Sequence, residues 1–227
     1  MVLGAAATVC ISASTAWAGD GHRVPDLYNK PQQARVHSHS KILVPLTVHL
    51  ATEGENQRRT LYRLNRSVRR ANRALARHGI EVVVHRVWRM PDGFDSITRR
   101  RDRRKLARYA ALDGTVHVFF VDHLELGSLA RGDREVRGMH WRYRGLRRKM
   151  RHREYIAINS DAPSTTLAHE VGHLFGLDHD RGHRNLMCSC RRGRIQQFTR
   201  GQGNKMRREA RAFFLRGRRF GGRSSHP

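Results

Sequence analysis

The stretch HEVGHLFGLDHD, from His169 to Asp180, holds three histidines, a glutamate and a glycine at spacings that suit a metal site. His169 and His173 are four residues apart, so on an α-helix they lie on one face, one turn apart. Glu170 follows the first histidine and need not bind the metal itself. Gly176 stands where the helix should end, because glycine adopts at low cost the left-handed conformation that reverses the chain.

The reversal at Gly176 would allow His179 to return as a third ligand. Three histidine nitrogens leave one open corner on a tetrahedral Zn²⁺, and water fills it. The alternative is a histidine-rich, solvated helix. It would need the whole pattern to arise by chance, which has a probability of about 2 in 10,000 for this composition. We therefore treat the stretch as a zinc motif.

The flanking sequence provides the context that such a motif needs. EYIAINS (154–160) alternates like a β-strand, and DAPSTT (161–166) contains helix-start signals in Pro163 and in Ser164 or a neighbouring hydroxyl. Met187 follows His179 by eight residues, in RNLMCSC.

The pattern His-Glu-x-x-His-x-x-Gly-x-x-His followed by a methionine resembles the signature of the metzincin zinc metalloproteases. The chain order is similar to that of a compact, matrixin-like, secreted bacterial form. The resemblance implies that Met187 forms an apolar floor beneath the three imidazoles. The tyrosine that follows this methionine in astacin-like members is absent, because Cys188 to Cys190 stands there.

Hydrophobic periodicity predicts an α/β (α+β) fold. The predicted strands are 41–50, 80–88, 115–122, 136–145 and 154–160. The predicted helices, besides the metal helix, are 60–78, 97–111 and about 201–216. This order is typical of a mixed, twisted five-stranded sheet with an active-site helix and a C-terminal helix. The resemblance implies that 138–144 is an antiparallel edge strand along the substrate cleft.

The domain organisation follows from the same patterns. Residues 1–18 are uncharged and end in Ala16-Trp17-Ala18, which predicts a secretory signal and hence a secreted or periplasmic protein. We expect a linker or short pro-segment (19–40), a catalytic domain (41–217) with an upper part (41–176) and a lower part (177–217), and a disordered tail (218–227). No other segment is long and apolar enough to span a bilayer, and we expect a monomer.

The charge of +26 is nearly all arginine. It favours acidic polymers or anionic surfaces as partners, with the runs at 99–105 and 142–154 the densest, although a GC-rich genome and solvated faces would also explain it. Signal cleavage would leave only Cys188 and Cys190. Free thiols, a strained bridge and adventitious metal capture stay open, and apolar filling beside Met187 is the favoured interpretation.

A second, structural Ca²⁺ or Zn²⁺ lacks a full ligand set, although His117, Asp122, His123 and His140 are candidates. The predicted function is a secreted zinc endopeptidase in which Glu170 is the general base for a zinc-bound water that attacks a protein or peptide substrate. The alternatives are a non-catalytic, secreted polyanion-binding protein with a structural zinc, and a zinc amidohydrolase that acts on a non-peptide amide.

Overall fold

The computed structural model describes residues 41–221 except 53, 129–131 and 189–195. The predicted secretory signal (1–18) and the predicted linker or pro-segment (19–40) lie outside the described residues. Cys190 lies outside them as well, together with the last part of the predicted tail (222–227).

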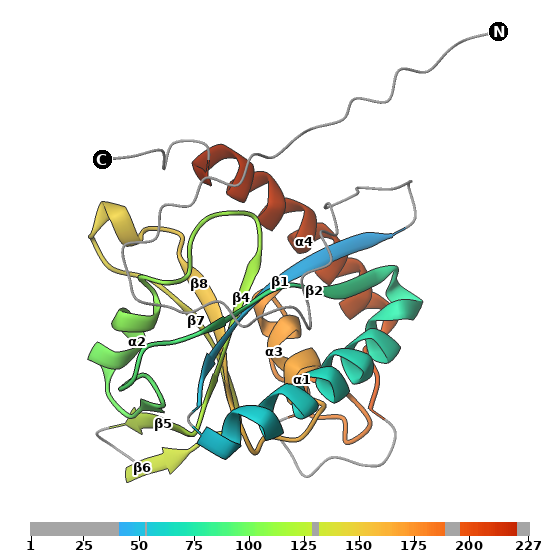
Figure 1. Ribbon diagram of the computed structural model, residues 1–227. Coiled ribbons are helices and arrows are strands. Elements are labelled where there is room, and N and C mark those ends of the chain that lie inside the picture. The colour runs from blue at the N-terminus through green and yellow to red at the C-terminus, as the bar shows by residue number, and fades with distance from the viewer. Residues whose placement is uncertain (1–40, 53, 129–131, 189–195, 222–227) are drawn as a thin grey trace, which may run out of the picture.

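A mixed five-stranded sheet forms the centre of the fold (Figure 1). Its strand order is β2-β1-β4-β8-β7. The strands are β1 (Ile42–Ala51), β2 (Ile80–Arg89), β4 (Val116–Val121), β7 (Gly138–Arg142) and β8 (Glu154–Asn159). The first four in the sheet run parallel, whereas β7 lies at the edge and pairs antiparallel with β8. The predicted α/β fold with an antiparallel edge strand is confirmed.

Helices cover both faces of this sheet. One face packs against α1 (Gly54–Leu75), α3 (Thr166–Leu174) and α4 (Arg200–Gly221), and the other face packs against α2 (Arg100–Leu106) (Figure 1). Every residue of β4 and β8 is buried, as expected for parallel strands covered on both sides. The 3₁₀ helix η1 (Ala76–His78) continues α1 and ends at Gly79, which has a φ of +63°.

The second predicted helix, 97–111, is much shorter in the structure. α2 covers only Arg100–Leu106 because a distant side chain takes the carbonyls that follow it. The Arg153 guanidinium donates to the carbonyl oxygens of Ala107 and Arg108, at 2.9 and 2.6 Å. Ala107 is itself fully buried against the sheet. A tertiary contact therefore ends this helix, and no local signal announces it.

A small three-stranded sheet was not predicted. It consists of β3 (Ser96–Ile97), β5 (His123–Ser128) and β6 (Gly132–Glu135), in the order β3-β5-β6. β3 pairs parallel with β5, and β6 pairs antiparallel with it. β3 and β6 have two and four residues, and β5 shows only a brief alternation at Leu124 and Leu126, so the pattern is too short to reveal these strands. The 3₁₀ helix η2 (Arg148–Met150) follows β7.

The last helix is longer than the predicted 201–216. α4 extends to Gly221 and so includes the first four residues of the segment 218–227, which was predicted to be a disordered tail. Within the described part of the chain, no helix combines the length and the apolar character that crossing a membrane requires.

Two neighbouring positions of α1 test how this helix is held on the sheet. Leu64 is fully buried in the main core, whereas 67% of Tyr62 is exposed. We expect Leu64→Ala to lower the free energy of unfolding by about 2–5 kcal/mol, because it leaves a cavity. Tyr62→Ala should change it by no more than about 0.5 kcal/mol. Urea titration followed by circular dichroism measures both values, and equal losses would contradict the observed packing of α1.

Candidate metal centre

α3 carries His169, Glu170 and His173, and it begins at the hydroxyl residue next to Ser164, within the predicted start. The N-cap residue is Thr165, but its side chain makes no capping hydrogen bond. The first turn is instead held by the backbone, where the Thr166 N–H donates to the Pro163 carbonyl at 2.9 Å. Glu170 and His169 are nearly completely buried along this helix.

The C-terminus of α3 ends as predicted, at a glycine in the left-handed region. Gly176 has a φ of +80°. Its N–H donates to the His173 carbonyl at 3.0 Å, and the Leu177 N–H donates to the Gly172 carbonyl at 2.9 Å. These two bonds form a Schellman motif, which turns the chain back across the end of the helix. The turn brings His179 to the two histidines of α3.

Two backbone carbonyls set the proton positions on the helical imidazoles. The Nδ1 atom of His169 lies 2.8 Å from the Leu186 carbonyl oxygen, and that of His173 lies 2.8 Å from the Leu177 carbonyl oxygen. A carbonyl oxygen only accepts, so each Nδ1 carries the proton and donates it. Each neutral ring therefore keeps a lone pair on Nε2, the atom that can bind a metal.

The three Nε2 atoms converge on one point. The Nε2 of His173 lies 3.1 Å from that of His169 and 3.2 Å from that of His179. Lone pairs that face one another at this distance repel unless a cation lies between them. Two nitrogens bound to one tetrahedral zinc at 2.0–2.1 Å lie about 3.3 Å apart, so the donor set fits Zn²⁺.

The environment of His173 favours the neutral, metal-binding form. Burial is the largest cause that lowers the pKa of His173, and positive charge on His179 or His140 would lower it further. The hydrogen bond to the Leu177 carbonyl acts in the opposite direction but does not outweigh burial. His179 is exposed, so the group opens to solvent on that side.

Met187 is fully buried beneath the histidine helix. A Cβ added at Gly172 would lie 2.5 Å from the Met187 sulfur, so a glycine is needed there for the two to approach this closely. The Asn185 side chain holds the turn, because its Oδ1 accepts from the Met187 N–H at 2.9 Å. Its Nδ2 donates to the Gln202 side chain of α4 at 3.1 Å. Sequence reasoning missed Asn185 and Gly172, although a glycine inside a helix does signal close packing.

Cys188 is disulfide-bonded and completely buried. The interpretation of this residue as a free thiol is therefore wrong, and its sulfur is not a metal ligand. The backbone beside it closes the loop that follows His179, because the Asp180 N–H donates to the Met187 carbonyl at 3.0 Å.

The edge strand passes directly over the Glu170 carboxylate. A Cβ built on Gly138 would lie 2.8 Å from Glu170 Oε1 and 2.6 Å from Thr166 Cγ2. Gly138 therefore allows the carboxylate to lie against β7, between the helix and the sheet edge. No sequence pattern identified Gly138, because its partner lies 32 residues away on another element.

The candidates for a second metal site, His117, Asp122, His123 and His140, do not form a group of three ligands among the described residues. His117 contacts His49 (2.9 Å) and Asp113 (3.3 Å), Asp122 accepts from the Ser160 hydroxyl (2.9 Å), and His140 contacts Glu154 (3.2 Å). Among the described residues, the only group of three or more candidate ligands is His169, His173 and His179. His183, four residues after His179, is not part of that group.

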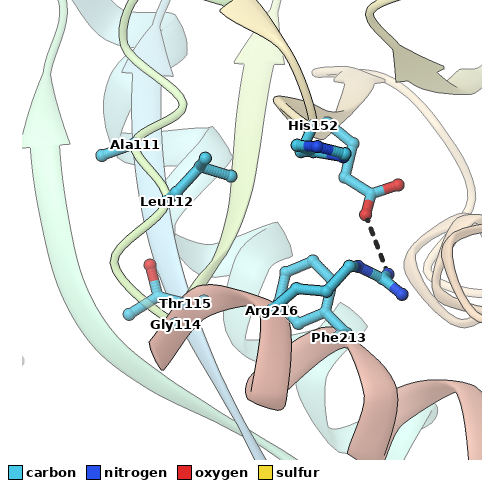
Figure 2. A pocket seen from close by; sticks show the side chains of 9 residues that line it. Ala111, Leu112, Gly114, Thr115, His152, Phe213 and Arg216 are labelled. Atoms are coloured by element: carbon cyan, nitrogen blue, oxygen red, sulfur yellow. Dashed lines mark ion pairs between the residues drawn. The ribbon is translucent and has the colours of Figure 1, made fainter. Parts of the chain in front are cut away.

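A separate pocket lies between the end of α4 and the loops that precede β4 and β8 (Figure 2). Its charged centre is Glu154, which lies 2.7 Å from Arg142 and 3.6 Å from Arg216. Burial alone would raise the pKa of Glu154, but the His140 hydrogen bond and the charge of Arg142 outweigh burial and lower it. None of the metal-centre residues lines this pocket. Through Glu154, its ion pairs connect Arg216 of α4 to Arg142 of the edge strand β7.

Comparison with protein families and with curated protein sequences finds no match. Two solved structures are similar to this chain at the level of the fold. The mature mirolysin of Tannerella forsythia, in complex with a cleaved peptide, aligns with a TM-score of 0.54 and 13% identity, over 84% of this chain and 100% of that one. Metalloproteinase-II from Bacteroides fragilis aligns with a TM-score of 0.51 and 12% identity, over 77% of this chain and 55% of that one. This chain thus spans about half the length of the Bacteroides protein. With the histidine triad on its helix and turn, the chain has a metzincin-type zinc metalloproteinase fold.

Proposed function

We propose that the chain is a zinc-dependent endopeptidase that hydrolyses peptide bonds in proteins or peptides. The observation that carries the proposal is the convergence of three imidazole Nε2 atoms on a helix that also carries the buried carboxylate of Glu170. The similar fold of mirolysin, solved with a cleaved peptide, supports a peptide as the substrate.

His169, His173 and His179 would hold the zinc through Nε2. When bound there, Zn²⁺ supplies Lewis acidity, which lowers the pKa of water and polarises a carbonyl oxygen. The protein contributes the fixed orientation of the rings, because the Leu186 and Leu177 carbonyls hold two of the three in one tautomer. The two rings therefore lose little conformational freedom when the ion binds.

Glu170 would carry out the proton transfers. Its carboxylate accepts a proton from the attacking water and passes it to the nitrogen of the leaving amine. The side chain is held for this role between α3 and Gly138 of the edge strand, which limits where the carboxylate can lie. A general base needs such restraint, since its distance from the transferred proton decides its efficiency.

The edge strand β7 offers a way to hold an extended peptide. Among the described strands, β7 has a neighbour in the sheet on one side only, β8. Its outer edge can therefore hydrogen-bond to an added strand. Because Gly138 on β7 contacts Glu170, a peptide paired to this edge would pass beside the proposed base. This arrangement favours a peptide over a small non-peptide amide.

A purely structural zinc fits the site less well. Structural zinc sites usually have four protein ligands, whereas three candidate ligands gather here among the described residues. A buried glutamate next to the first ligand also has no evident use in a structural site. Both observations favour the enzyme over a binding protein.

The ligand assignment predicts different outcomes for two exposed histidines. We expect purified wild-type protein to retain one zinc per chain after gel filtration. His179→Ala should weaken zinc binding by at least about tenfold, because it removes a third of the donor set. His183→Ala is the matched control and should retain the metal. Zinc content by mass spectrometry and competition with a chromogenic chelator measure both, and equal losses would contradict the assignment.

The general-base role predicts a loss of turnover without a loss of metal. We expect Glu170→Gln to lower kcat for a fluorogenic casein by about 10²- to 10⁴-fold while zinc content stays at the wild-type level. A chelator should abolish the wild-type activity, and added zinc should restore it. Cleavage by Glu170→Gln at the wild-type rate would show that another group moves the proton.

The contact between Gly138 of β7 and the Glu170 carboxylate predicts that a methyl group added at Gly138 lowers kcat. Gly138→Ala should displace the Glu170 carboxylate and lower kcat by about 10- to 100-fold, with zinc content unchanged. Gly201→Ala is the control, since its Cβ would meet nothing nearer than Thr199 Oγ1 at 4.0 Å. An unchanged kcat in Gly138→Ala would mean that the carboxylate position is not critical.

A further inference from the structure

The solvent-exposed side of α1 and η1 forms one continuous basic surface, which is independent of the metal centre. Its exposed positions recur every three or four residues and fall within about 120° of the helix circumference. We call this surface the basic face of α1, and it consists of Arg58, Arg59, Tyr62, Asn65, Arg66, Arg69, Arg73, Ala76 and Arg77.

The composition of this face differs from that of an ordinary solvated helix. Six of its nine positions are arginine, whereas 45 Lys and Arg among 227 residues, one in five, would place about two there. No Asp or Glu occurs between Asn56 and Ile80. If the arginines served only solubility, we would expect acidic side chains among them. Opposite charges four residues apart stabilise a helix.

Three arginines in the middle of this face carry charges that no described acidic side chain neutralises. The half-buried Arg63, beside the face, pairs with Asp161 and with the Ser160 carbonyl. By contrast, Arg66, Arg69 and Arg73 form no ion pair with any described acidic side chain. Arg69 and Arg73 are also four residues apart, so like charges repel along the helix. A bound polyanion would remove that repulsion.

The chemistry of the face selects among polyanions. Arginine binds phosphate through two parallel hydrogen bonds, which lysine cannot make. Tyr62 lies among the arginines and is 67% exposed, so its ring can stack on a nucleobase. Insertion into a membrane is disfavoured, because the apolar side of α1 (Leu64, Ala71, Leu75) is buried in the core. The arginines between Arg58 and Arg77 extend along about 28 Å of helix.

We propose that the basic face of α1 binds single-stranded nucleic acid. The arginines contact the phosphate backbone, and Tyr62 stacks on a base. Binding through phosphates and one stacking contact has no strong sequence preference and weakens steeply with salt. The interaction does not depend on zinc or on Glu170, so it survives if the proposed protease activity is wrong.

The test measures fluorescence anisotropy of a labelled single-stranded DNA of about 20 nucleotides and mixed sequence, which exceeds the length of the face. Salt is varied from about 50 to about 200 mM. The test variant is the triple substitution Arg66→Gln, Arg69→Gln and Arg73→Gln. The matched control removes the same charge from α2 and the turn that follows it, on the other side of the sheet, with Arg100→Gln, Arg104→Gln and Arg108→Gln. All six positions are exposed and glutamine favours helix, so both proteins should fold, which circular dichroism checks.

We expect the α1 variant to bind at least about tenfold more weakly and to lower the slope of log K against log salt by about 2. The α2 control should change Kd by less than about threefold. Tyr62→Ala should weaken binding to the single strand by about fivefold or more and leave duplex binding nearly unchanged.

Three results would overturn the proposal. Equal weakening by both triple variants would mean that the net charge, rather than α1, attracts DNA. Binding of a heparin oligosaccharide or of anionic vesicles through α1, without binding of the oligonucleotide, would assign the face to another partner. An unaffected Tyr62→Ala variant would remove the stacking contact that selects nucleic acid.

Discussion

Two hydrogen bonds from imidazole Nδ1 atoms to backbone carbonyls decide which nitrogen of each ring can bind a metal. His169 and His173 donate their Nδ1 protons to the carbonyls of Leu186 and Leu177, so their Nε2 lone pairs point at each other and at His179. Such an arrangement is electrostatically unfavourable without a cation. The fold around it therefore has to hold the lone pairs together against their repulsion.

The segment after α3 supplies that restraint. The Schellman turn at Gly176 places the Leu177 carbonyl, and the loop around Met187 places the Leu186 carbonyl. Asn185 ties this loop to α4, and Gly172 lets the Met187 sulfur approach the helix. A change in any of these contacts would shift the Leu177 carbonyl, the Leu186 carbonyl or the Met187 side chain. It would therefore disturb the imidazoles without replacing one of them.

Acidic side chains are scarce in this protein, and several of those described are used inside the structure. There are 19 Asp and Glu against 45 Lys and Arg. Glu154 neutralises Arg142 between β7 and β8, and Asp161 neutralises Arg63. Arg66, Arg69 and Arg73 of α1 then form no ion pair with a described acidic side chain, and this scarcity of acids leaves the exposed side of an amphipathic helix strongly basic.

The sequence by itself determined the features that depend on local spacing. The one-turn separation of His169 and His173, the helix end at Gly176 and the return of His179 all lie within eleven residues, where helix geometry decides which side chains meet. The central strands β1 and β4 were recognisable for a similar reason, because burial on both faces leaves a largely apolar run. Tertiary structure alone decided the contacts between distant residues. The end of α2 depends on Arg153, the position of Glu170 depends on Gly138, and His140 pairs with Glu154 instead of a metal. Each of these joins elements whose approach is set by packing across the sheet, and spacing along the chain carries no record of such packing.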